Sequence, residues 1–181
     1  EYAGAASPPV RVTTELLLIA LAAMGAESAE GEGSAAWLYQ QIGSTELNRI
    51  RSECFTGYEI TLPGPGAEHA AGLSEGVANV LEAAVEIARR TTGREEIHPR
   101  HLLAAIFTGR SGPEISGAML ELERMGHKAD ALRTGLFDVV RGCEDNDAQW
   151  SLVLLGRELR VYRMAGFHAD DTRGANAFTG S

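Results

Sequence analysis

Hydrophobic positions follow a helical period along most of the first 143 residues. After Ser74, apolar residues recur at i, i+3, i+4, i+7 and i+11, which indicates an amphipathic helix that stops at Thr92-Gly93. The apolar run "TELLLIALAAMG" (14–25) lies between threonine, a residue typical of helix starts, and glycine, a residue typical of helix ends. Patterns of this kind predict helices over residues 14–25, 34–43, 45–57, 74–92, 99–107, 114–125 and 129–141.

One segment interrupts this helical pattern. Residues 59–73, "EITLPGPGAEHAAGL", contain Pro63-Gly64-Pro65-Gly66, and no helix continues through such a sequence. The segment is therefore the best internal boundary of the chain, and we expect it to be a linker between two halves.

The two halves align with each other. Residues 1–21 lie over residues 86–106 without a gap, at an offset of 85 positions that places Ile97 on Val12. The agreement includes a helix stop, since Pro8 falls on Gly93, as well as the following loop length and the next helix start. We interpret the alignment as an internal repeat of four helices: one long, one short and buried, one short and one of medium length.

The repeat predicts the organisation of the whole chain. The fold class is all-α, with two tandem four-helix repeats followed by an extended C-terminal tail. Because the first repeat begins at the equivalent of Glu86, most of its opening helix is expected upstream of residue 1, so the chain looks like a piece of a longer protein. The predicted parts are a first repeat (1–58), a linker (59–73), a second repeat (74–143) and a tail (144–181).

Composition narrows the classes of partner. The net charge of −9 and the single lysine, Lys128, argue against a nucleic-acid partner, because an acidic surface repels phosphate. The longest apolar run, residues 16–24, is about half of what a membrane span needs, so no membrane association is expected. Cys54 and Cys143 are too few for a disulfide framework, and we expect two free thiols in a reducing, cytoplasmic compartment.

The stretch "EEIHPRHLLAAIF" (95–107) carries the strongest candidate for metal chemistry. His98 and His101, with Glu95 or Glu96, could supply three ligands, but His-x-x-His alone is a weak signal. Pro99 suits the first position of a helix, which makes His98 the cap and places His101 in the first turn. We therefore predict helix capping and packing, with no metal and no cofactor, and we interpret His168, Asp170 and Asp171 as parts of a flexible linker.

The duplicated helix entries, "VTTELLLIAL" (12–21) and "IHPRHLLAAI" (97–106), resemble a known family. Together with "RMGHKADALRTGLFDVV" (124–140), they resemble the Clp N-terminal domain, a double four-helix repeat that precedes the ATPase rings of Clp unfoldases. The resemblance covers roughly residues 1–143. It implies an all-α domain without catalytic activity, which binds adaptors and substrate proteins and passes them to an ATPase.

The resemblance also implies candidate contact residues. In some members, a glutamate in each Thr-Glu-His-Leu-Leu motif helps bind phosphorylated arginine; Glu15 matches that glutamate and Thr14 the threonine. In the second half, Pro99 and Arg100 replace Thr-Glu. An arginine there would repel the guanidinium part of that ligand, although it could attract the phosphate. Glu15 is therefore interpreted first as a carboxylate that complements a helix dipole. The candidate ligand or partner contacts are Thr14, Glu15, Arg100 and His101.

The end of the chain carries a second resemblance. "AGFHADDTRGANAFTGS" (165–181) is similar to the segment that leads into the ATPase domain of KAP-type P-loop NTPases, although no Gly-x-x-x-x-Gly-Lys-[Ser/Thr] motif occurs in the chain. We therefore expect a non-catalytic recognition module whose ATPase lies outside these residues. The expected partner is a peptide, adaptor, substrate protein or the protein's own ATPase domain. The alternative is a regulatory module of a multidomain NTPase or a homo-oligomerisation module.

Overall fold

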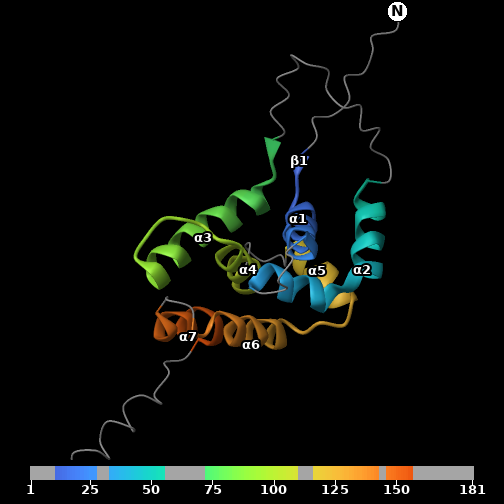
Figure 1. Cartoon of the computed structure of the whole chain (residues 1–181). Helices are drawn as coiled ribbons and strands as arrows, with labels where there is room; N and C mark the ends of the chain where they lie inside the picture. Colours follow the sequence, from blue (N-terminus) through green and yellow to red (C-terminus); the bar gives the residue numbers. More distant parts are fainter. Residues whose placement is uncertain (1–10, 28–32, 56–71, 110–115, 143–145, 157–181) are drawn as a thin grey trace, which may run out of the picture.

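The computed structural model describes residues 11–27, 33–55, 72–109, 116–142 and 146–156. These residues form seven α-helices and one pair of two-residue strands (Figure 1). The fold class is therefore all-α, as predicted. In chain order, the elements are β1 (Arg11–Val12), α1 (Thr14–Glu27), α2 (Ser34–Phe55), β2 (Gly72–Leu73), α3 (Glu75–Thr92), α4 (Pro99–Thr108), α5 (Gly117–Arg124), α6 (Ala129–Val140) and α7 (Asp147–Leu155).

The helices pack mainly in pairs around α4. Helix α1 lies against α2 and α5, α3 lies against α4, and α6 lies against α7 (Figure 1). Helix α4 also contacts α2, α5, α6 and α7. The two strands pair in parallel, with Arg11 opposite Gly72 and Val12 opposite Leu73, and so bring the starts of α1 and α3 together.

Local capping signals explain several helix boundaries. Ser74 caps α3 by accepting a hydrogen bond from the Val77 N–H at 3.2 Å, and Gly93 ends the same helix in the left-handed conformation. Helix α4 begins with Pro99 as predicted, and its cap is His98. Thr14 and Pro99 are the first residues of α1 and α4, and they are the two positions that the alignment superposes.

Two glycines in the first half act differently from each other. Gly43 interrupts α2 with φ 75° and ψ 157°, so the element consists of two helical stretches, as the sequence predicts. Gly25 does not end α1, which continues to Glu27. A Cβ at Gly25 would overlap the carbonyl of Ala35 in α2, so this glycine permits the close approach of α1 and α2 rather than a helix end.

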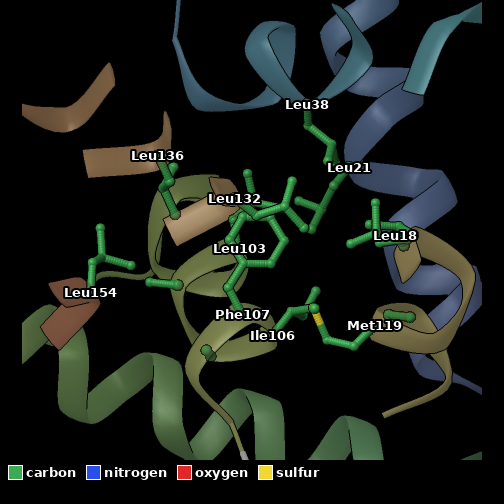
Figure 2. Packing of buried hydrophobic residues seen from close by; sticks show 14 of the residues in the cluster. Leu18, Leu21, Leu38, Leu103, Ile106, Phe107, Met119, Leu132, Leu136 and Leu154 are labelled. Carbon is green, nitrogen blue, oxygen red and sulfur yellow. The ribbon is translucent and has the colours of Figure 1, made fainter. Parts of the chain in front are cut away.

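One hydrophobic core includes side chains from both halves of the chain. In Figure 2, Leu18, Leu21 and Leu38 from the first half surround the same space as Leu103 and Phe107 of α4. Leu18, Leu38 and Leu103 are completely buried. The described helices on the two sides of the 59–73 segment are therefore packed together, while residues 1–10 and 56–71 lie outside the described part of the chain.

The tail corrects a prediction. We expected an extended segment from residue 144, whereas residues Asp147–Leu155 form α7, which packs on α6, α3 and α4. The Asn146 side chain caps α7 by accepting hydrogen bonds from the N–H groups of Ala148 and Gln149. Trp150 is completely buried, and its burial explains why this short segment is helical. Residues 157–181 lie outside the described part of the chain.

Candidate functional site

Thr14 lies where the first turns of three helices meet. Pairing of β1 with β2 places the first residue of α1 beside the first turn of α3, where a Cβ on Gly76 would stand 3.3 Å from Thr14 Cγ2. The third helix is α5, whose Ala118 N–H donates a hydrogen bond to Thr14 Oγ1 at 3.2 Å. Thr14 is only 5% exposed, so its hydroxyl fixes α5 against α1 inside the protein.

Glu15 extends this junction towards the surface. Its Oε2 accepts a hydrogen bond from the Thr14 hydroxyl at 3.3 Å, and its carboxylate lies so close to Gly117 that a Cβ there would overlap it. Ser116 caps α5 by accepting from the Met119 N–H at 3.3 Å. A negative charge beside the first residue of α5 complements the positive end of that helix. Glu15 thus complements a second helix besides its own.

The Glu15 carboxylate is half-buried and faces no cation among the described residues. No arginine, lysine or histidine within 11–27, 33–55, 72–109, 116–142 or 146–156 forms an ion pair with it. Cys54, a free thiol, lies near this charge. Burial raises the pKa of the Cys54 thiol, and the negative charges of Glu15, Glu121 and Glu53 raise it further. Cys143 lies outside the described residues.

A charged network joins α2 to α5 next to this region. Arg49 contacts Glu46 at 2.7 Å, Glu53 at 2.8 Å and Glu121 at 3.5 Å, and Arg124 adds ion pairs to Glu53 and Glu121. The hydrogen bond from Arg49 lowers the pKa of Glu53. This network was not predicted from the sequence, although the i, i+3 and i+4 spacing of Glu46, Arg49 and Glu53 is the usual signal for such pairs. Four members of this network line a surface hollow of about 450 Å³: Glu46, Arg49, Glu53 and Arg124.

His101 has a structural role in α4. Its ring is completely buried and stacks on Trp150, with the ring centroids 5.5 Å apart and the planes at 4°. Its Nδ1 accepts a hydrogen bond from the His98 N–H at 3.0 Å, and its Nε2 lies 3.5 Å from Thr91 Oγ1. Because the Thr91 hydroxyl donates to the Ile87 carbonyl, Nε2 is the donor to Thr91. His101 therefore connects α3, α4 and α7 through a neutral ring.

These contacts show the role of the histidine pair at the start of α4. The capping interpretation is confirmed: His98 is the cap, Pro99 follows it, and His101 receives the His98 N–H. Both ring nitrogens of His101 have partners within the protein, so metal binding through either nitrogen would displace the contact that this nitrogen makes. Within the described ranges, no group of three or more His, Cys, Asp or Glu side chains is arranged to hold a metal ion. His168, Asp170 and Asp171 lie outside those ranges.

The four predicted contact residues occupy two places, the first turn of α1 and the first turn of α4. Thr14 and Glu15 contact α5, whereas His101 contacts α3 and α7. Arg100 is half-buried in the first turn of α4, at the position that Glu15 has in α1. The geometry therefore makes Thr14 and Glu15, rather than all four residues, the candidate site.

Comparisons with known proteins leave the family unassigned. No family model matches the sequence, and searches of curated proteins and of solved structures found no significant match. Among the described helices, none is long and apolar enough to cross a membrane.

Proposed function

We propose that this chain is a non-catalytic protein-recognition module that binds a cationic side chain of a peptide, adaptor or substrate protein at Glu15. The observation that carries the proposal is the half-buried Glu15 carboxylate, which is held by Thr14 and by the start of α5 but forms no ion pair within the described residues. Such a group is already oriented, so an incoming guanidinium or ammonium group would gain a charge-assisted hydrogen bond at little entropic cost.

The proposed role follows the Clp resemblance only in part. In the resemblance, the equivalents of Glu15 and Arg100 would both be glutamates that help bind phosphorylated arginine. Arg100 breaks this pattern. The next residue, His101, stands at the histidine position of the Thr-Glu-His-Leu-Leu motif and is fully occupied by packing. We therefore propose a cationic side chain at Glu15, without a second equivalent site, and an ATPase located outside these residues as the recipient of the bound protein.

Titration of the isotopically labelled full chain followed by NMR tests the proposal. The probe is the peptide Ac-Ala-Leu-Arg-Leu-Ala-amide, and its matched control carries citrulline, which has the shape of arginine but no charge. We expect the arginine peptide to shift the amide signals of Glu15, Gly117 and Ala118, with a much smaller effect of the citrulline peptide.

Two variants complete this experiment. Glu15→Gln should abolish the response, whereas Glu123→Gln, on the exposed side of α5, should preserve it. Equal responses to both peptides, or an unchanged response in Glu15→Gln, would show that Glu15 is not the recognition residue.

A regulatory or oligomerisation module is the second candidate function. The observation that favours it is the exposure of large apolar side chains, including Met24 at 54% and Leu120 at 49%. Light scattering of the purified chain separates the two functions. A stable oligomer in the absence of any ligand would favour assembly, and a monomer at all accessible concentrations would favour recognition.

A further inference from the structure

Helices α1 and α4 have matching core faces. At the alignment offset of 85, Leu18 corresponds to Leu103, and both are completely buried. Leu21 corresponds to Ile106, and these side chains are 2% and 1% exposed. The two helices therefore present the same face to the common core, which makes a comparison of their other faces meaningful.

One face differs between them. Ala105 of α4 is completely buried, whereas Ala20, its counterpart in α1, is exposed. One turn earlier, His101 is completely buried while its counterpart Leu16 is only half-buried. One turn later on the same face, Met24 is 54% exposed. Residues Leu16, Ala20 and Met24 are spaced at i, i+4 and i+8, so they form a continuous apolar face, which we call the α1 face.

In α4, the corresponding face is covered by α3 together with α7. Thr91, in the last turn of α3, meets His101 in the first turn of α4, so the end of α3 lies beside the start of α4. Helix α3 is strongly amphipathic, and Ala84 and Ala88 on its buried side are completely inaccessible to solvent. Small residues at these positions allow two helices to approach closely.

Charge indicates which kind of helix would cover the α1 face. A helix placed on α1 as α3 is placed on α4 ends beside the first turn of α1, where Glu15 forms no ion pair within the described residues. Helix α3 carries Arg89 and Arg90 in its last turn, whereas α4, the helix it covers, begins with Arg100 in place of Glu15. A helix with a basic last turn would therefore be complementary to α1 in both shape and charge.

We propose that the α1 face docks an amphipathic helix of a partner protein whose last turn lies beside the first turn of α1. Its aliphatic and alanine side chains would pack on Leu16, Ala20 and Met24. A basic side chain of its last turn would bind Glu15. This inference rests on the proposed recognition of a cationic side chain and names the class of partner: a helix laid along a helix, rather than an extended peptide.

A labelled peptide with the sequence of residues 74–93, SEGVANVLEAAVEIARRTTG, is a suitable probe. Fluorescence anisotropy with the full chain should give saturable binding. Ala20→Glu should weaken it about tenfold or more, because docking would bury an unpaired charge. The control Ala131→Glu places the same charge on an exposed alanine of α6 and should leave binding unchanged. Circular dichroism and thermal unfolding check that both variants fold.

The outcomes separate this inference from the function on which it rests. Loss of binding in Ala20→Glu with retention in Ala131→Glu supports it, as does weaker binding of a peptide with Arg89→Gln and Arg90→Gln. Absence of saturable binding, or equal binding by Ala20→Glu and the wild type, overturns it. Persistence of the arginine-dependent NMR response in that case leaves recognition at Glu15 standing. Self-association of the wild type that Ala20→Glu abolishes also overturns it, because a second copy would then occupy the α1 face.

Discussion

The Thr14 hydroxyl serves two helices at once. It accepts the Ala118 N–H, one of the free donors in the first turn of α5, and donates to the carboxylate of Glu15. No local signal predicts the first contact, because the two residues are 104 positions apart in the sequence. The place of Thr14 at a helix start is visible in the sequence, but the helix that its hydroxyl caps is not.

Thr14→Val should destabilise the protein by about 1–2 kcal/mol, because the Ala118 N–H is left buried without an acceptor while the side-chain volume is conserved. Urea denaturation measures the free energy of unfolding. Thr134→Val removes a hydroxyl from an exposed position of α6 and should cost much less. Equal costs for the two variants would mean that the Thr14 hydroxyl adds nothing to the packing of α5.

The Cys54 thiol should report the charge of Glu15. Because its pKa is raised by burial and then by Glu15, Glu121 and Glu53, little thiolate forms near neutral pH, and alkylation by iodoacetamide should be slow. Glu15→Gln should lower the pKa and accelerate alkylation at pH 8, as measured by mass spectrometry of the peptide that contains Cys54. Glu96→Gln, next to His98 at the start of α4, is the control and should have no effect.

The same shift has a consequence for stability. A thiol whose pKa is raised on folding contributes stability at pH values below its ordinary pKa, and this contribution is lost as the pH rises through the raised value. Urea denaturation at several pH values should therefore show a smaller fall in the free energy of unfolding between pH 8 and 10 for Cys54→Ser than for the wild type.

At the scale of single elements, the starts of the helices could be predicted from local capping residues. Some other positions, however, are determined by a neighbouring helix and not by the segment itself. Ser74, His98 and Asn146 act within their own segments, so their sequence signals are reliable. Gly25 is the opposite case, since it resembles a helix end but is required by a neighbouring helix. The residues of α7 were assigned to an extended tail because the apolar residues of this segment do not gather on one side, so the segment shows little helical periodicity.

Gly25→Ala provides a test of the contact between α1 and α2. In an isolated helix, alanine in place of glycine stabilises by about 1 kcal/mol. Here, the added methyl group would overlap the Ala35 carbonyl, so we expect destabilisation instead. Gly76→Ala in α3 is the control. The nearest atom to its Cβ would be the Thr14 methyl carbon at 3.3 Å, which is a much milder contact than the overlap at Gly25. A rise in melting temperature for Gly25→Ala would contradict the close approach of the two helices.

Trp150→Ala should detach α7. The substitution removes the indole that stacks on His101 and leaves a cavity, at a cost of about 3–5 kcal/mol. Hydrogen exchange should then show lost protection in residues 147–155 and smaller changes in α1 and α2. Leu152→Ala, at a position that is 41% exposed on the same helix, should cost much less. Unchanged protection of α7 in Trp150→Ala would show that other contacts hold it.

At the scale of the whole molecule, the two halves share one core. The sequence predicted the two halves from their common pattern, but each contact between them joins residues far apart in the chain, and periodicity within a helix does not specify its neighbours. The boundary at residues 59–73 therefore indicated where the chain can turn, and it carried no information about whether the halves unfold separately.

Leu103→Ala tests the shared core. Leu103 lies in α4 among side chains of both halves, and the substitution should cost about 2–5 kcal/mol (Figure 2). We expect a single unfolding transition, shifted as a whole, when the helical signal and the tryptophan signal are followed together. Two separated transitions would show that each half is a unit of its own.

The parallel stack of Trp150 on His101 also makes the protein its own optical reporter. A neutral imidazole and a protonated one affect indole emission differently, since the cation quenches it by accepting an electron from the excited ring. The other tryptophan, Trp37, packs edge-on against Phe107 and contributes a separate signal. In a Trp37→Phe background, the emission of the remaining indole would record, without any added label, whether α7 is seated and whether the buried imidazole beside it has gained a proton.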